Sequence, residues 1–177
     1  MLTLDVSNST LIIVDFQSRL MPAIHQGETA VKNAGRLLDA AQLLGVPAIF
    51  TEQNAKGLGA TVPELDTGRG RLFHKQYFDA AREAGFLDLV PQDRTVVVAG
   101  CEAHVCVQQT VLGMIDHGRS VSVVRDALGA RQSESKETAI LRMASKGADI
   151  VTTEMVVFEW LQTAEHPRFR EAVALIK

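Results

Sequence analysis

The strongest constraint on the fold is an alternation of short apolar runs with longer segments of helical periodicity. The apolar runs lie at 10–15, 46–51, 95–100, 120–125 and 149–153, and they are continuous rather than alternating, as in strands buried on both faces. Helical spacing covers 28–44, 105–117, 133–146, 154–161 and 166–176, and glycines follow the first three segments. Buried strands joined by helices predict an α/β fold with a parallel sheet covered on both faces.

The composition fits a single globular domain over residues 1–177. The chain is 46% hydrophobic and 22% charged, with a formal charge of −3, so neither nucleic acid nor an anionic membrane is an expected partner. The first apolar run, Leu11 to Val14, ends at Asp15 and is too short for a signal core or a membrane span. We therefore expect a cytoplasmic protein.

Residues 52–75 interrupt the alternation. The segment is rich in glycine and shows no clear periodicity. A stretch of this length inside a compact domain is typical of a functional segment, and an ordinary surface connection is the plainer alternative. The sequence leaves the role of the segment open.

Cys106 lies just after a predicted buried strand that stops at Gly100, where a helix begins. A thiol in the first turns of a helix faces the positive end of the helix dipole and open backbone amides, which favour the thiolate and can bind an oxyanion. Asp15 ends the first strand, and ligands bind beyond the carboxyl ends of parallel strands. If the two strands are neighbours, Asp15 can act as a base for the thiol, and Lys75 is the best cation to offset their repulsion.

These residues and their spacing resemble the motifs of the isochorismatase-like cysteine hydrolase family. Asp15 stands in Val-Asp-Phe-Gln, Lys75 in His-Lys-Gln-Tyr-Phe, and Cys106 in Gly-Cys-Glu-Ala-His-Val-Cys-Val. The stretch 51–65 further resembles the isochorismatase-domain-containing subgroup, whose substrates are generally undefined. The resemblance implies a three-layer αβα architecture with a six-stranded parallel sheet of order 3-2-1-4-5-6, and it places Asp15 and Cys106 on adjacent strands.

The resemblance also implies a catalytic triad of Asp15, Lys75 and Cys106. It implies a cis peptide bond between Cys101 and Glu102, and oxyanion-binding backbone amides at Glu102 and Cys106. The expected reaction is cysteine-dependent hydrolysis of a small C–N bond of the amide type through a thioester intermediate. The expected partners are a small-molecule substrate and further copies of the chain in a homo-oligomer.

No metal and no cofactor are expected. Nicotinamidases of the wider family carry an Asp-x-His pair after the second strand, whereas this chain has Thr51-Glu-Gln-Asn54. The missing histidine argues against a bound metal and against nicotinamide as the substrate. Isochorismatases proper hydrolyse a vinyl ether and need no cysteine, so Cys106 argues against that reaction too.

Six further residues are predicted to line the substrate pocket, with ordinary packing as the alternative: Phe16, Gln17, Leu20, Gln53, Phe78 and His104. Residues two positions apart on a helix do not share a face, so His104 is expected to line the pocket or support the structure rather than act as a base for Cys106. Three cations of the irregular segment could recognise a substrate carboxylate, but solvated loop charges are the favoured interpretation of Arg69, Arg71 and His74.

Two other kinds of function stay open at this stage. Cys101 and Cys106 could form a reversible bond in a thiol redox protein, although a reducing compartment and the lack of a second Cys/His pair disfavour disulfide and zinc roles. A binding or scaffold protein that keeps the fold without activity is the other alternative. The complete set of Asp15, Lys75 and Cys106 favours the enzyme.

Overall fold

A computed structural model describes residues 2–177 and contains one six-stranded sheet. All paired neighbours run parallel, in the order β3-β2-β1-β4-β5-β6. The predicted strand order is therefore confirmed. The strands are β1 (Ser9–Val14), β2 (Ala48–Gln53), β3 (Arg71–Lys75), β4 (Thr95–Cys101), β5 (Val121–Gly129) and β6 (Asp149–Val151).

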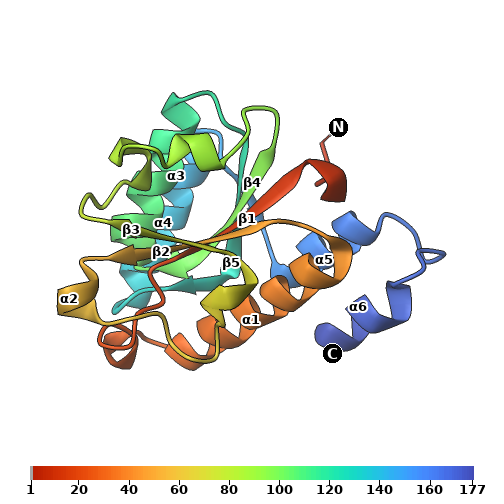
Figure 1. The fold of residues 1–177 in the computed structure, drawn as a ribbon, viewed down its shortest axis with the longest axis horizontal. Coiled ribbons are helices and arrows are strands. Elements are labelled where there is room, and N and C mark those ends of the chain that lie inside the picture. The colour runs from red at the N-terminus through yellow and green to blue at the C-terminus, as the bar shows by residue number, and fades with distance from the viewer. Residues whose placement is uncertain (1) are drawn as a thin grey trace.

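Helices cover both faces of this sheet, as Figure 1 shows. Helices α1, α5 and α6 lie on one face, and α3 and α4 lie on the other. The predicted three-layer architecture is thus confirmed. The helices are α1 (Gly27–Leu44), α2 (Ala55–Leu58), α3 (Gln108–Asp116), α4 (Ser133–Ser145), α5 (Thr153–Leu161) and α6 (Phe169–Leu175), and a π-helical turn, η6 (Ala103–Val107), precedes α3.

The continuous apolar character of β1 follows from its position between the two helical layers. All six of its residues are buried. Leu11 and Ile13 pack with α1 and α5 on one side, while Ile12 and Val14 pack with α3 and α4 on the other. Complete burial of a side chain of this size contributes about 1.5–3 kcal/mol, so a polar residue on either face would weaken one of the two cores.

Gly100 allows β4 to end close to its neighbours. It pairs with Val14 in the register of the sheet. A Cβ atom at this position would lie 2.6 Å from both the Cβ and the carbonyl oxygen of Val14, and 3.0 Å from Cγ2 of Val107. Any larger residue would therefore push apart the end of β1 and the turn that carries Cys106.

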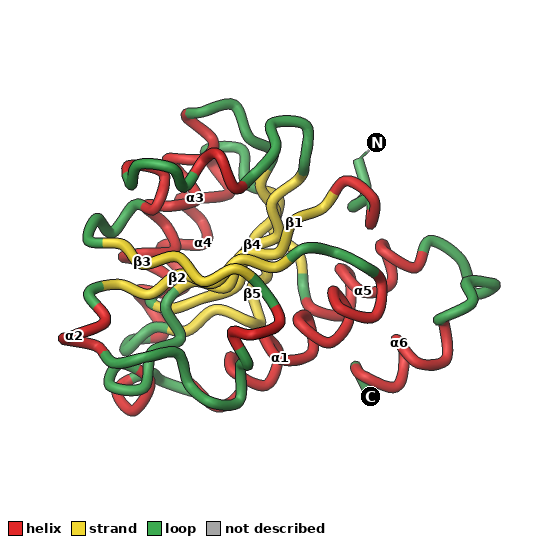
Figure 2. The backbone as a smooth tube through the Cα atoms, viewed as in Figure 1, coloured by secondary structure: helices red, strands yellow, loops and turns green. Residues whose placement is uncertain are grey.

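The irregular segment 52–75 is more ordered than its sequence pattern indicates. Its last residues form β3, the edge strand that pairs with β2, and Figure 2 shows the loop path that leads to this strand. Four of the five β3 residues are not buried, because one side of an edge strand has no neighbour. The polar residues Arg71, His74 and Lys75 hide the strand from a search for apolar runs.

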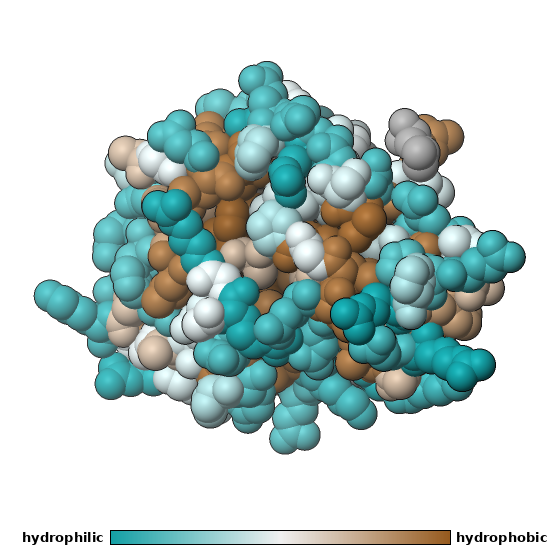
Figure 3. All heavy atoms as spheres, turned by 45° about the vertical axis from the view of Figure 1, so that its right-hand side comes forward, coloured by the Kyte–Doolittle hydropathy of each residue, from teal (hydrophilic) through white to brown (hydrophobic). Residues whose placement is uncertain are grey.

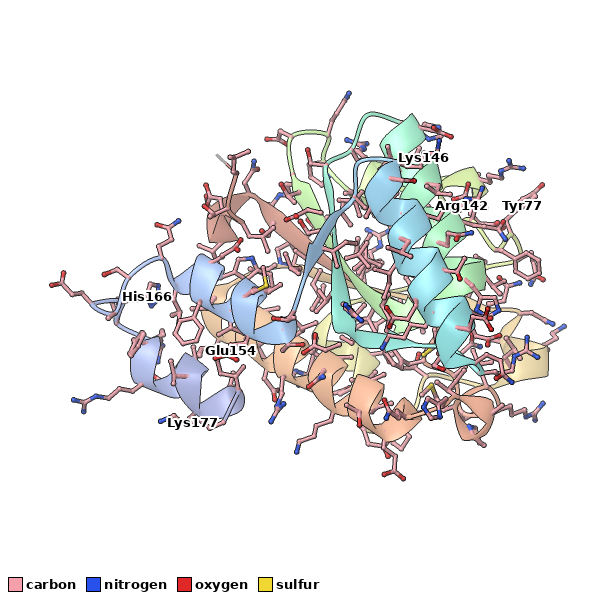
Figure 4. All side chains as sticks on the ribbon, turned by 180° about the vertical axis from the view of Figure 1, so that it is seen from behind. Tyr77, Arg142, Lys146, Glu154, His166 and Lys177 are labelled. Carbon is pink, nitrogen blue, oxygen red and sulfur yellow. The ribbon has the colours of Figure 1, made fainter. Side chains whose placement is uncertain are left out.

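The outer surface carries most of the charged side chains. Hydrophilic residues dominate the face seen in Figure 3, and hydrophobic ones show between them. In Figure 4, Arg142 projects from α4 away from the sheet, Lys146 lies just after the end of α4, and Tyr77 projects from the segment after β3. Among residues 2–177, no helix combines the length and the apolar character needed to cross a membrane.

Candidate active site

Asp15 follows β1 in a left-handed backbone conformation, with a φ of 51°. Aspartate tolerates this region better than most residues, and such outliers concentrate at functional sites. Its backbone N–H still donates to the Thr51 carbonyl at 3.1 Å, so the residue leaves the regular strand, which ends at Val14, without losing this bond. The turn sends the side chain into the protein, where Asp15 is only 1% exposed.

Lys75 ends β3, two strands away, and its side chain reaches across β2 to Asp15. Its Nζ donates to Asp15 Oδ2 at 2.7 Å, and neither side chain is exposed to solvent. A second bond, 2.9 Å long, joins Nζ to Gln53 Oε1. The ammonium group is therefore held between the ends of the first two strands of the chain, and the sequence-predicted residues Asp15 and Lys75 form a buried ion pair.

Cys106 lies in the η6 turn just before α3 and is 7% exposed. Burial and, to a smaller extent, the nearby Asp15 carboxylate raise the pKa of its thiol from the ordinary value of 9.0 to about 12. The Lys75 ammonium acts in the opposite direction. In the resting protein the thiol is therefore protonated at neutral pH, unlike the thiolate expected at the start of a helix, because burial and the Asp15 carboxylate both favour the neutral form.

A cavity of about 320 Å³ opens beside Cys106. Apolar side chains form much of its wall, and two arginines and one glutamate supply charge. Its volume suits a small organic molecule. The lining residues are Arg19, Leu20, Ala23, Gln53, Leu58, Phe78, Glu102, Val105, Cys106 and Arg131.

The predicted pocket residues divide between this cavity and the core. Leu20, Gln53 and Phe78 line the cavity. Phe16 and Gln17 do not, because both are completely buried: Phe16 packs in the core on the α1 side. The Gln17 side chain donates to the Gly59 carbonyl at 2.6 Å and accepts from the Gln53 backbone N–H at 2.8 Å, so it ties the segment after β2 to the sheet.

His104 lies on the other side of the turn that carries Cys106. It lines a separate cavity of about 370 Å³ with residues of α4. Its Nδ1 is buried without a hydrogen-bond partner among the described residues. The two-residue offset explains this placement, since His104 and Cys106 point to different sides of a helical turn. The prediction that His104 lines the pocket of Cys106 is therefore corrected.

Glu102 stands at a cis peptide bond with Cys101, as the family resemblance implies. Its carboxylate accepts from the Arg131 backbone N–H at 3.1 Å and from Arg131 Nε at 3.0 Å. Sequence reasoning missed Arg131 and Arg19 as cavity residues. The signal for Arg131 was its position just after a strand of the parallel sheet, at the edge where ligands bind.

Cys101, the second cysteine, ends β4 and is completely buried. Burial raises the pKa of its thiol well above the ordinary value. Both cysteines are free. Cys101 also packs against Gly129, where a Cβ atom would lie 2.6 Å from its sulfur. Cys101 therefore has a packing role.

Residues 51–54 stand where nicotinamidases carry their Asp-x-His pair, and they contribute to the site in other ways. Thr51 and Gln53 bond Asp15 and Lys75 respectively. Glu52 is turned away and accepts from the backbone N–H and the hydroxyl of Thr61. Within residues 2–177, no group of three or more His, Cys, Asp or Glu side chains is arranged to hold a metal ion.

The fold and the site together define a member of the isochorismatase-like hydrolases. The sequence profile of the isochorismatase domain matches residues 9–155, and the chain belongs to this family. It is 38% identical over 178 residues to isochorismatase domain-containing protein 1 from Danio rerio, covering 98% of this chain and 62% of that relative. The chain thus spans less than two thirds of the relative's length.

Two solved structures show how far the likeness extends. The MAR1 ribonuclease from Caenorhabditis elegans superposes with a TM-score of 0.91 at 33% identity, over 98% of this chain and 92% of that one. The YcaC gene product from Escherichia coli, described as an octameric hydrolase of unknown specificity, superposes with a TM-score of 0.87 at 24% identity, over 99% and 88%. At 24% identity, the likeness to the YcaC gene product supports the fold alone. Its description as an octamer shows that some structural relatives are oligomeric.

Proposed function

We propose that the protein is a cysteine-dependent hydrolase of small amides, with Cys106 as the nucleophile, Asp15 as the proton acceptor and Lys75 as the charge partner. The observation that carries the proposal is the fully buried Asp15–Lys75 pair beside a thiol at the wall of a cavity. A buried ion pair adds little stability over apolar packing of the same volume. Its place beside a nucleophile in a cavity is typical of a functional site.

The raised pKa of Cys106 determines how the reaction begins. At neutral pH the thiol is protonated, so attack requires transfer of its proton. Asp15 takes this proton while Cys106 Sγ bonds to the amide carbonyl carbon. The carbonyl oxygen becomes an oxyanion, and the backbone amides of Glu102 and Cys106 are the proposed donors to it. Donors of this kind typically contribute about 100- to 1,000-fold in rate.

The tetrahedral intermediate then loses its amine. Asp15 returns the proton to the departing nitrogen, the C–N bond breaks, and the acyl group remains on Cys106 as a thioester. Asp15 next takes a proton from water as the water attacks the thioester. The C–S bond breaks, the acid leaves, and the proton returns to Cys106. The net reaction converts one amide and one water into an acid and an amine.

The cavity wall indicates the kind of amide. Leu20, Leu58 and Val105 present apolar surface, whereas Arg19 and Arg131 present guanidinium groups. The Arg131 side chain is 59% exposed, and its Nε is bonded to Glu102, which leaves the terminal nitrogens to meet a ligand. Arginine suits carboxylates because its donors form a planar fork. We therefore favour a short acyl chain that carries an acidic group.

A ribonuclease activity is the alternative that the name of the Caenorhabditis elegans relative raises. Against it, the cavity contains a thiol, and its volume of about 320 Å³ suits a small molecule better than a polymer. Thiol redox chemistry has less support, because Cys101 is completely buried and its pKa is raised. Unlike Cys106, Cys101 does not line the cavity, so an exchange partner in the cavity cannot reach its sulfur.

We also propose that the chain is one domain that assembles into a homo-oligomer. The octameric relative from Escherichia coli supports assembly by analogy of fold. Tyr77 and the cavity residue Phe78 are 56% and 50% exposed, and large exposed aromatic side chains are frequent at interfaces. Light scattering at working concentration tests this point, and a mass equal to the single chain of 19.2 kDa would contradict it.

The test of the function compares two cysteine variants on a panel of small amides. Propionamide, succinamate and nicotinamide are incubated with the wild-type protein, with Cys106→Ala and with Cys101→Ala, and the released ammonia is measured. We expect release with the wild-type protein and with Cys101→Ala, and none above background with Cys106→Ala. Equal release by Cys106→Ala would contradict the proposal, and cleavage of an RNA oligonucleotide without amide turnover would favour the alternative.

A further inference from the structure

Thr51 contacts Asp15 through both its side chain and its main chain. Its hydroxyl donates to Asp15 Oδ1 at 2.6 Å, and its carbonyl oxygen accepts from the Asp15 backbone N–H at 3.1 Å. Both residues are 1% exposed. Thr51 pairs with Val14 in the register of β1 and β2, so the sheet itself sets it beside the residue that follows Val14.

The two oxygens of the Asp15 carboxylate have different partners. Oδ1 accepts from the Thr51 hydroxyl, and Oδ2 accepts from Lys75. Bonds to both oxygens fix the plane of the carboxylate. The other titratable groups that face Asp15 are the thiols of Cys101 on β4 and Cys106 on η6. Of the two side chains that donate to the Asp15 carboxylate, Lys75 is charged and Thr51 is neutral.

The side chain of threonine suits this task. Two heavy atoms on Cβ restrict its χ1 angle, so the hydroxyl on a buried strand has few alternative positions. Thr10 provides a natural comparison within the same sheet. It is also 1% exposed, it lies on β1, and its hydroxyl has no hydrogen-bond partner in the described part of the chain.

We propose that Thr51 is a positioning residue that holds the Asp15 carboxylate in its orientation toward Cys106. The assignment rests on the proposed function, because Thr51 acts through the base of that reaction and does not itself touch the reacting atoms. The hydroxyl of Thr51, and not the volume of its side chain, therefore carries the role.

The experiment measures the rate at which p-nitrophenyl acetate acylates Cys106 in the first turnover at neutral pH. Thr51→Val keeps the shape of the side chain and removes the donor, so Asp15 Oδ1 loses the hydroxyl that holds it. We expect the acylation rate to fall by about 10-fold or more. Thr51→Ser, which restores a donor, should return the rate toward the wild-type value, and Thr10→Val should leave it unchanged.

Several controls separate the possible outcomes. A Thr51→Val protein that melts at a lower temperature but keeps the wild-type acylation rate would show a structural role and overturn the inference. Should that variant fail to fold, Thr51→Ala with the same readout replaces it. An equal fall in rate when Thr51→Val is added to Asp15→Asn would also overturn the inference, because the hydroxyl would then not act through Asp15. Wild-type acylation in Cys106→Ala would instead contradict the proposed function.

Discussion

Lys75 Nζ lies 2.7 Å from Asp15 Oδ2, although 60 positions separate the two residues in the chain. The ion pair spans three strands, because Lys75 ends the edge strand β3 and Asp15 follows β1, with β2 between them. Gln53 at the end of β2 accepts a bond from the same ammonium group. The parallel sheet thus brings both charges together at the carboxyl ends of its strands. The cation comes from β3, the outermost strand.

Removal of the cation should strongly destabilise the protein. Lys75→Met leaves the Asp15 carboxylate buried without its charged partner, and breaking a buried pair in this way typically costs about 3–5 kcal/mol. The free energy of unfolding, measured in urea, should fall by that amount. The double variant with Asp15→Asn should recover part of the loss.

The matched control is an exposed ion pair. Arg168 lies 3.0 Å from Glu171, with both side chains 55% exposed, and Arg168→Gln should change stability by less than about 1 kcal/mol. A loss for Lys75→Met as small as that for Arg168→Gln would mean that the buried pair is not formed.

The thiol of Cys106 should titrate far above neutral pH. In a Cys101→Ala background, the ultraviolet absorption of the thiolate should rise with a midpoint near the pKa of about 12. Asp15→Asn should move the midpoint down, because the carboxylate raises this pKa, and Lys75→Met should move it up. A thiolate already present at neutral pH in the wild-type background would contradict this account.

Because the pKa of Cys106 is raised in the folded protein, stability should fall as the pH rises through the alkaline range. The pKa in the folded state, about 12, lies above the ordinary 9.0, so the unfolded chain releases its proton first as the pH rises. Stability from the protonated thiol is complete below about pH 9 and is lost between about 9 and 12. Cys106→Ala should reduce the loss of unfolding free energy across this window, measured relative to the wild-type protein.

Gly100 should not tolerate a methyl group. A Cβ atom there meets Val14 at 2.6 Å, and overpacking of this kind costs about 1–3 kcal/mol. The control is Gly35 in α1, where the nearest atom, Leu65 Cδ2, would lie 3.9 Å away. Gly35→Ala should stabilise the protein by about 0.5–1 kcal/mol. Equal effects of the two substitutions in urea unfolding would refute the close approach of β4 and β1.

Arg131 should govern selectivity for acidic amides. Arg131→Gln removes a guanidinium group at the cavity wall, so kcat/KM for succinamate should fall by about 10-fold or more, in line with loss of a charge-assisted bond. The value for propionamide, which has no carboxylate, should change little. Parallel losses for both substrates would indicate that Arg131 acts through its bonds to Glu102 rather than through the substrate.

Much of the fold could be predicted because its strands are buried on both faces. The runs that became β1, β2, β4, β5 and β6 stand out as apolar segments between helices, and their boundaries in the structure differ by a few residues. β3 could not be found in this way, since an edge strand is partly exposed and carries polar residues. Its order beside β2 came from the family resemblance.

The candidate site divides in a similar manner. Asp15, Lys75 and Cys106 could be named because strand ends and motif spacing mark them. Whether a residue lines the pocket depends on the direction of its side chain, which sequence distance does not reveal. The predictions for Phe16, Gln17 and His104 were therefore wrong. The pKa of Cys106 could not be predicted either, since burial depends on the packing around the turn.

The most direct test of the central claim is to trap the acyl group. The wild-type protein is quenched in acid during turnover of the best amide from the panel, digested, and analysed by mass spectrometry. The account predicts the acyl mass on the peptide that contains Cys106, its release by hydroxylamine, and its absence from Cys106→Ala. Sustained turnover with no acyl group on Cys106, or with the group on another residue, would contradict it.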